Sequence, residues 1–126
     1  MLKRIPPILL RWLPAILVMA SIFFFSSRPS DDLPNFDFFD DFVKKSGHVI
    51  GYGLLAFSYL HGFNRRDRRY FNIAWLLAVL YALTDEYHQS FVAGRNASIW
   101  DVVLFDNLGA ILALYYTFAK RQKMKL

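Results

Sequence analysis

Side chains that could carry out chemistry are concentrated at the ends of apolar stretches. They comprise bases, carboxylates and cations, which are the groups needed for acid–base catalysis or for binding an anion. In chain order they are Lys45, His48, Tyr52, Asp85, Glu86, Gln89, Arg95, Asp101, Asp106 and Asn107. Because residues three or four apart share one face of a helix, we expect His48 to lie beside Tyr52. The same spacing relates Glu86 to Gln89, so the set can converge on one polar pocket.

Two of these residues have a chemistry that depends on their surroundings. His48 falls in the first turn of a predicted helix that Ser46 can cap, where the helix dipole favours the neutral imidazole that acts as a base or ligand. The planar guanidinium of Arg95 suits a carboxylate or a phosphate. Arg95 is therefore either a clamp paired with Glu86 or Asp101, or an anion receptor, and the sequence leaves both alternatives open.

Four apolar blocks must position these side chains. The 126 residues are 56% hydrophobic and 20% charged and include no cysteine, a more apolar composition than that of ordinary soluble domains. Each block can cover roughly 25–32 Å as a helix, close to the thickness of a bilayer core of about 30 Å. We predict one domain, 1–126, that is an all-α membrane protein with a four-helix transmembrane bundle. The predicted spans are 8–27, 47–63, 71–87 and 99–119.

Basic residues predict the orientation of these spans. Cytoplasmic loops carry an excess of Lys and Arg. Here basic residues lie at the N-terminal end, between the second and third spans, and after the fourth: Lys3, Arg4, Arg11, Arg65, Arg66, Arg68, Arg69, Lys120, Arg121, Lys123 and Lys125. We therefore expect both termini to be cytoplasmic and the polar pocket to face outward. Because the excess is divided among three short segments, topology explains it better than nucleic-acid binding, and we expect no nucleic-acid partner.

The first span has an alternative interpretation as a cleaved signal peptide, because Lys3 and Arg4 precede an apolar run. The length of the run, the presence of Arg11 within it and the lack of an Ala-x-Ala-like cleavage site all favour a transmembrane span.

The outward connection between the first two spans has a pattern of its own. Phe36, Phe39 and Phe42 recur at helical spacing between Asp residues, which predicts a short amphipathic helix lying at the outer membrane interface. The alternative is a loop that packs these rings onto the bundle.

The order and spacing of the polar residues resemble the VanZ-like membrane protein family. The matching pattern is Lys45-Ser46-Gly47-His48, Tyr52, Glu86-Tyr87-His88-Gln89, Gly94-Arg95, Ser98, Asp101 and Asp106-Asn107-Leu108-Gly109-Ala110. The resemblance covers roughly residues 44–113 and implies a small multi-pass protein of the bacterial cytoplasmic membrane. It also implies a role in the cell envelope, since the family is named after a teicoplanin-resistance protein.

The resemblance further implies that a polar family signature falls on Lys45, His48, Tyr52, Glu86, Gln89, Arg95, Asp101 and either Asp106 or Asn107. The family tends to place Asp or Asn about one helical turn after the first Asp. Here Asp106 is five residues beyond Asp101, so the sequence leaves open which residue faces the pocket.

Three functions fit these residues. The first, which we favour, is binding of an anionic envelope lipid or lipid-linked precursor headgroup, with a contribution to glycopeptide tolerance. Its ligand-binding residues would be Lys45, Tyr52, Asp85, Gln89, Arg95, Asp106 and Asn107. The second is acid–base or phosphoryl chemistry on a lipid-linked substrate, with His48, Glu86 and Asp101 as catalytic residues. The third is proton-coupled transport by a homo-oligomer, because intramembrane carboxylates are typical of transporters.

Two more specific chemistries are weaker matches to the sequence. Ser46-Gly47-His48 looks like the Ser-Gly-His of membrane lipid phosphatases, but no histidine follows Arg95. A metal site could use His48, His88 and a carboxylate, yet no dense ligand motif fixes its geometry. We therefore expect neither a metal nor another cofactor.

Overall fold

The computed structural model describes residues 3–29, 37–65, 67–95 and 98–124, with the side chains of Asp37, Asp40, Asp41 and Asp101 excepted. Every regular element in this part of the chain is helical. The elements are α1 (Pro7–Ser26), η2 (Asp37–Phe39), α2 (Asp40–Phe63), α3 (Arg68–Gln89), α4 (Ile99–Asp101), η3 (Val102–Asp106) and α5 (Asn107–Met124). The last three follow one another directly and make up the fourth main helical segment, so the prediction of an all-helical chain is confirmed.

Local sequence explains where several helices begin and end. Pro7 occupies the first turn of α1, a position where its fixed φ and missing N–H are tolerated. The residue after α2, Asn64, has a φ of 53°, in the left-handed region that Asn adopts more readily than most residues and that often ends a helix. Before α4, the hydroxyl of Ser98 accepts a hydrogen bond from the backbone N–H of Trp100 at 3.3 Å.

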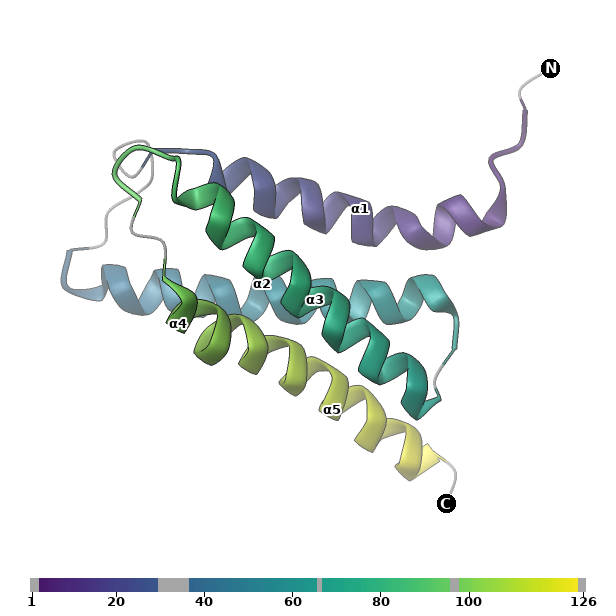
Figure 1. The fold of residues 1–126 in the computed structure, drawn as a ribbon. Coiled ribbons are helices and arrows are strands. Elements are labelled where there is room, and N and C mark those ends of the chain that lie inside the picture. Colours follow the sequence, from purple (N-terminus) through teal and green to yellow (C-terminus); the bar gives the residue numbers. More distant parts are fainter. Residues whose placement is uncertain (1–2, 30–36, 66, 96–97, 125–126) are drawn as a thin grey trace.

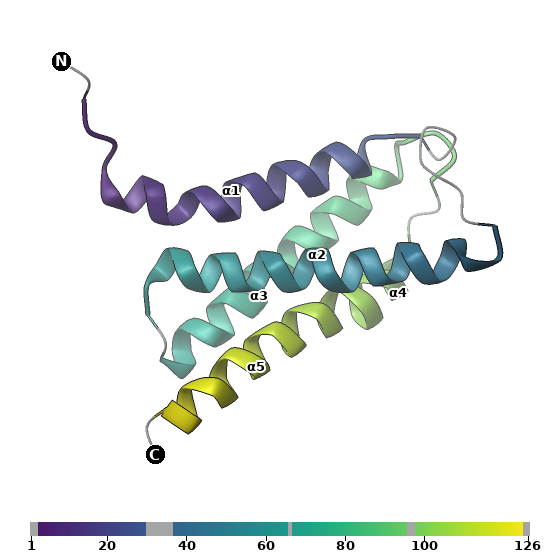
Figure 2. The ribbon, with the colours of Figure 1, turned by 180° about the vertical axis from the view of Figure 1, so that it is seen from behind.

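The helix α2 lies at the centre of the bundle and packs against α1, α3 and α5. The outer helices α1 and α5 lie on opposite sides of it (Figures 1 and 2). Both termini lie at one end of the molecule, and the C-terminal end of α1, the beginning of α2 and α4 lie at the other (Figure 1). The four main helices therefore bring residues distant in sequence together at the end away from the termini.

Small residues allow the helices to approach closely. Ala56, Ala74, Ala82 and Ala110 are fully buried, and Ala78 is nearly so. The tightest contact joins α2 to α5, where a methyl group added to Gly109 would collide with the backbone of Val49. Small residues at helix contacts are typical of membrane bundles, in which close packing replaces the hydrophobic driving force.

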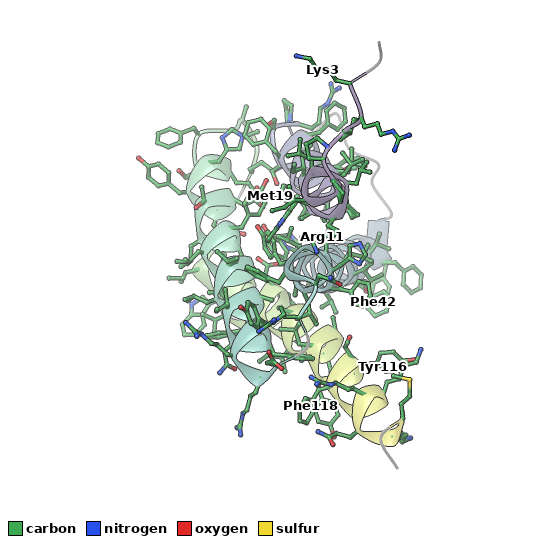
Figure 3. All side chains as sticks on the ribbon, turned by 90° about the vertical axis from the view of Figure 1, so that its right-hand side faces the viewer. Lys3, Arg11, Met19, Phe42, Tyr116 and Phe118 are labelled. Carbon is green, nitrogen blue, oxygen red and sulfur yellow. The ribbon has the colours of Figure 1, made fainter. Side chains whose placement is uncertain are left out.

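Large apolar side chains cover the outside of the bundle as well as filling its centre, where Leu55 and Leu60 are fully buried. Phe42 and Tyr116 project outward from α2 and α5 (Figure 3) and are 71% and 67% exposed. Two helical segments, Pro7–Ser26 and Val102–Met124, are long and apolar enough to cross a membrane. An apolar exterior, with small residues where the helices meet, is the arrangement expected for a protein surrounded by lipid.

The connection between the first two spans was expected to hold a separate interfacial helix, but the structure shows none in its described part. After η2, the helix α2 begins at Asp40 and continues for 24 residues, so Phe42 lies in the first turn of a single long helix. Because residues 40–46 contain neither Pro nor Gly, nothing in them interrupts the helix. Phe36, which belongs to the same expectation, lies outside the described residues.

Candidate functional site

A cleft of about 700 Å³ runs between α1 and α2 toward the end of α3. Its apolar walls are formed by Leu17, Val18, Ile22, Phe25 and Leu54. Its polar and charged residues are Ser21, Ser26, Lys44, Lys45, His48, Tyr52, Asp85, Gln89 and Arg95. The cleft also exposes Gly47 and Gly51, where an added Cβ would meet no atom within 4 Å, so these glycines leave open space on one face of α2.

His48 is held by a carboxylate from the fourth helical segment. Its Nδ1 lies 2.7 Å from Oδ1 of Asp106, and the two groups form a hydrogen bond. The ring of His48 is also nearly parallel to that of Tyr52, one helical turn further along α2. Asp106 is only 2% exposed, whereas His48 is half-buried and borders the cleft. The carboxylate therefore orients an imidazole that borders the cleft.

Asp85 is the centre of a second network, which links three helices. Its Oδ2 accepts hydrogen bonds from the hydroxyl of Tyr52 at 3.0 Å and from Nε2 of Gln89 at 3.2 Å. The same Gln89 nitrogen lies 3.1 Å from the hydroxyl oxygen of Ser26 in α1, to which it donates. Asp85 and Gln89 are each 6% exposed. Since each buried polar group here has a partner, the network can fix the relative positions of α1, α2 and α3.

Glu86 ties the end of α3 to the beginning of the fourth helical segment. Its Oε2 accepts a hydrogen bond of 2.8 Å from the backbone N–H of Ser98. One potential ligand atom from each of Glu86, His48 and Asp106 lies within 4.8 Å of the other two. Three chemically active side chains from α2, α3 and η3 therefore meet behind the cleft.

Arg95 holds the end of α1. Its Nε donates a hydrogen bond of 3.0 Å to the carbonyl oxygen of Arg28, and its Nη2 donates to the carbonyl oxygen of Phe25. Carbonyls at the end of a helix lack partners within the helix, so a guanidinium is well suited to them. Burial lowers the pKa of Arg95, while the charges of Asp85 and Glu86 act in the opposite direction.

The VanZ/LLP1 family profile matches residues 11–121 of the chain. The chain belongs to the VanZ/LLP1 family. No curated protein matches it, and neither does any solved structure. The resemblance seen in the sequence is thus confirmed, and the match extends through α1, outside the part in which the polar pattern was recognised. Together with the two segments able to cross a membrane, family membership indicates a membrane protein.

The structure accounts for the unusual spacing in this VanZ/LLP1 chain. Val102–Asp106 forms a π-helical turn, η3, instead of continuing the α-helix. Because hydrogen bonds in a π-helix join residues five apart, this turn accommodates a five-residue spacing between Asp101 and Asp106. Asp106 then points to His48, whereas the side-chain oxygen of Asn107 accepts a hydrogen bond of 2.6 Å from Nε1 of Trp75.

Not every predicted site residue of the VanZ/LLP1 chain lies in the cleft. His88 bonds to the hydroxyl of Ser27 at 2.9 Å and stacks on Phe23, so the metal site considered with His88 is not assembled among the described side chains. The side chain of Asp101 lies outside the described residues. Lys45 borders the cleft and also lies over the ring of Phe105, 5.3 Å from its centroid.

Three polar residues that line the cleft, Ser21, Ser26 and Lys44, were not predicted from the sequence. Lys44 lines the cleft beside Lys45, and its neighbouring position was the available signal. Ser26 contributes its hydroxyl from the end of α1, where nothing in an apolar block distinguishes it from Ser27. Only the packing of α1 against α3 selects one serine over the other.

Proposed function

We propose that this VanZ/LLP1 protein binds an anionic envelope lipid or lipid-linked precursor by its headgroup, in the cleft between α1 and α2. The observation that carries this proposal is the division of one cleft into apolar walls and a basic, polar end. A phospholipid or a polyprenyl phosphate has the same division between its chains and its headgroup. The volume, about 700 Å³, falls within the range common for small-molecule sites.

The basic end supports recognition of a phosphate. Lys44, Lys45 and Arg95 border the cleft from two elements, and cations with several N–H donors are the usual partners of phosphate oxygens. Arg95 is already bonded to carbonyls of α1, so its contribution is mainly its charge and its hold on the cleft wall. Lys44 and Lys45 bring two further cationic groups to the same end of the cleft.

The apolar walls support a ligand that stays partly in the membrane. Leu17, Val18 and Ile22 come from one face of α1, and Leu54 faces them from α2. In our proposal all four main helices cross the membrane with both termini in the cytoplasm, and the basic end of the cleft faces outward. The exposed rings of Phe39 in η2 and of Phe42 at the beginning of α2 then rest at the outer interface. Membership of a family that includes VanZ supports a contribution to glycopeptide tolerance.

A second candidate function is acid–base catalysis on the same class of ligand. It is favoured by the hydrogen bond of 2.7 Å between His48 and Asp106. A carboxylate that orients the imidazole of His48 supports the exchange of a proton between that ring and a ligand in the cleft. Lipid turnover that is lost in His48→Gln while lipid binding is kept would identify this function. Equal loss of binding and turnover would assign His48 to recognition.

The binding proposal is tested with the full chain in nanodiscs whose lipids are mainly phosphatidylcholine with a small fraction of phosphatidylglycerol. Native mass spectrometry then measures which lipids stay bound. We expect the wild type to retain phosphatidylglycerol preferentially. The double variant Lys44→Gln/Lys45→Gln should lose about 10-fold or more of this preference, since a hydrogen bond to a charged group contributes about 1.5–3 kcal/mol.

The matched control is Lys120→Gln/Lys123→Gln, which removes the same charge from the end of α5 that lies away from the cleft. It should retain the preference of the wild type. Equal losses in both double variants would show that net charge alone attracts the lipid and would contradict the proposed site.

A further inference from the structure

Three side chains of metal-binding type converge where α2, α3 and η3 meet. They are His48, Glu86 and Asp106, and one potential ligand atom of each lies within 4.8 Å of the others. We propose that these residues bind a divalent metal ion and that their donor set fits Zn²⁺. This inference goes beyond headgroup binding, because neither Lys45 nor Arg95 takes part in it.

The chemical types of the three donor atoms favour a transition metal such as zinc. One imidazole nitrogen with two carboxylate oxygens is a set that Zn²⁺ accepts, and an open fourth position is common in such three-ligand sites. Two ligands each about 2.1 Å from a shared ion are at most about 4.2 Å apart. The cluster, which spans up to 4.8 Å, therefore needs to contract by at least about 0.6 Å, and by about 1.4 Å to reach the roughly 3.4 Å between ligands of a tetrahedral ion. Rotation of carboxylate side chains can supply a change of that size.

The burial of the two carboxylates also favours an ion. Glu86 is 7% exposed and Asp106 is 2% exposed, although they come from different elements. Charges of the same sign that share a buried site raise one another's free energy, and a bound divalent cation reverses the effect. The position of the cluster thus gives a cation a larger stabilising role than it would have at the surface.

Surrounding structure holds two of the three ligands in place. The N–H of Ser98 bonds to Oε2 of Glu86 at 2.8 Å, a contact of the kind that orients metal ligands from outside the coordination sphere. The turn of η3 directs Asp106 toward His48, and π-helical turns occur frequently at functional sites. The ligands are therefore positioned by backbone features independent of one another.

Glu86 distinguishes a metal site from a simple hydrogen-bonded pair. The bond between His48 and Asp106 needs only those two residues, whereas an ion uses Glu86 as well. Glu86→Gln keeps the shape of the side chain and an oxygen that can accept from Ser98, but it removes the negative charge. This variant should disturb metal binding while leaving the His48–Asp106 contact intact.

The test uses the full chain in detergent, treated with a chelator and then titrated with Zn²⁺ by isothermal calorimetry. Visible absorption of added Co²⁺ gives a second readout that reports the ligand field. We expect one equivalent of Zn²⁺ per chain in the wild type. Affinity should fall at least about 10-fold in Glu86→Gln and in His48→Gln, because each removes a ligand. The melting temperature of the wild type should rise with Zn²⁺, and that of Glu86→Gln should rise less.

His88→Gln is the matched control, since His88 also lies near the end of α3 but bonds to Ser27. It should bind Zn²⁺ as the wild type does. The proposal is overturned if the wild type binds no Zn²⁺, if Glu86→Gln and His48→Gln bind it unchanged, or if His88→Gln weakens it equally. Circular dichroism and gel filtration identify variants that fold. If one of the two ligand variants does not fold, the other decides the test.

Discussion

At the end of the bundle that contains the cleft, hydrogen bonds between side chains join the helices, whereas aromatic rings join them at the end that carries the termini. Asp85, Tyr52 and Gln89 exemplify the first kind of contact. At the other end, the rings of Trp12 and Phe63 meet edge to face with centroids 5.0 Å apart. The helices are thus held together by hydrogen bonds at one end and by packing of aromatic rings at the other.

The difference indicates a division of roles between the two ends. Ring contacts contribute packing energy but tolerate small shifts, while a hydrogen-bonded network fails when one partner moves. A site that recognises a headgroup or an ion needs fixed polar groups. We therefore expect changes at the aromatic end to alter stability alone, and changes at the polar end to alter stability and binding together.

The largest effect is expected where α2 and α5 approach most closely at a glycine. In Gly109→Ala, the added methyl group collides with the backbone of Val49, so α2 and α5 must separate. We expect a loss of stability of about 3 kcal/mol, at the upper end of the range for overpacking, measured by unfolding in detergent.

Gly51→Ala provides the control for that substitution. A Cβ at Gly51 would have no atom within 4 Å, and alanine favours the helix by about 0.5–1 kcal/mol. Its stability should equal or exceed that of the wild type. If Gly109→Ala were as stable as Gly51→Ala, α2 and α5 could not approach each other as closely as the structure places them.

A smaller effect on stability, together with a loss of binding, is expected at the polar end. Asp85→Ala leaves the hydroxyl of Tyr52 and the amide of Gln89 without their acceptor, which should cost about 1–3 kcal/mol. Retention of phosphatidylglycerol should fall with it. The neighbouring Thr84→Ala removes only a bond to the carbonyl oxygen of Leu80 within α3 and should change neither quantity. If Asp85→Ala retained phosphatidylglycerol as the wild type does, the hydrogen-bond network around Asp85 would have no role in lipid binding.

The smallest effect is expected at the aromatic end. Trp12→Leu keeps an apolar side chain but removes the edge-to-face contact with Phe63, worth about 0.5–1.5 kcal/mol. Unfolding in detergent should report that loss, while lipid retention measured by native mass spectrometry stays unchanged. A loss of lipid retention as large as in Asp85→Ala would show that the two ends are not separate in function.

Helical periodicity explains most of what the sequence could predict. The spacing of His48 from Tyr52 follows from 3.6 residues per turn, and the structure places both beside the cleft. Gln89, which the sequence paired with Glu86, bonds to Asp85 instead. The four apolar blocks correspond to the four main helices, with changed ends. Hydropathy alone placed the second block at residue 47, but α2 begins at Asp40 because a helix continues through polar residues that favour it.

Features that depend on long-range contacts or on irregular backbone could not be predicted from the sequence. The choice of Asp106 over Asn107 rests on the π-helical turn of η3, which no periodic pattern anticipates. The sequence predicted that Arg95, if it is a clamp, pairs with a carboxylate. Its described hydrogen bonds go instead to the backbone carbonyls of Phe25 and Arg28 at the end of α1. A carbonyl oxygen is present at every residue, so side-chain types cannot identify it as a partner.

Photo-crosslinking in native membranes tests the central claim, that the cleft holds an anionic lipid, most directly. A photoreactive amino acid replaces Ser21, which lines the cleft, and in a second sample Ile111, which is exposed on α5 outside it. Mass spectrometry then identifies the attached lipids. We predict that adducts at position 21 are enriched in anionic lipids or lipid-linked phosphates relative to position 111, and that Lys44→Gln/Lys45→Gln abolishes the enrichment. The same lipid composition at both positions would contradict the account.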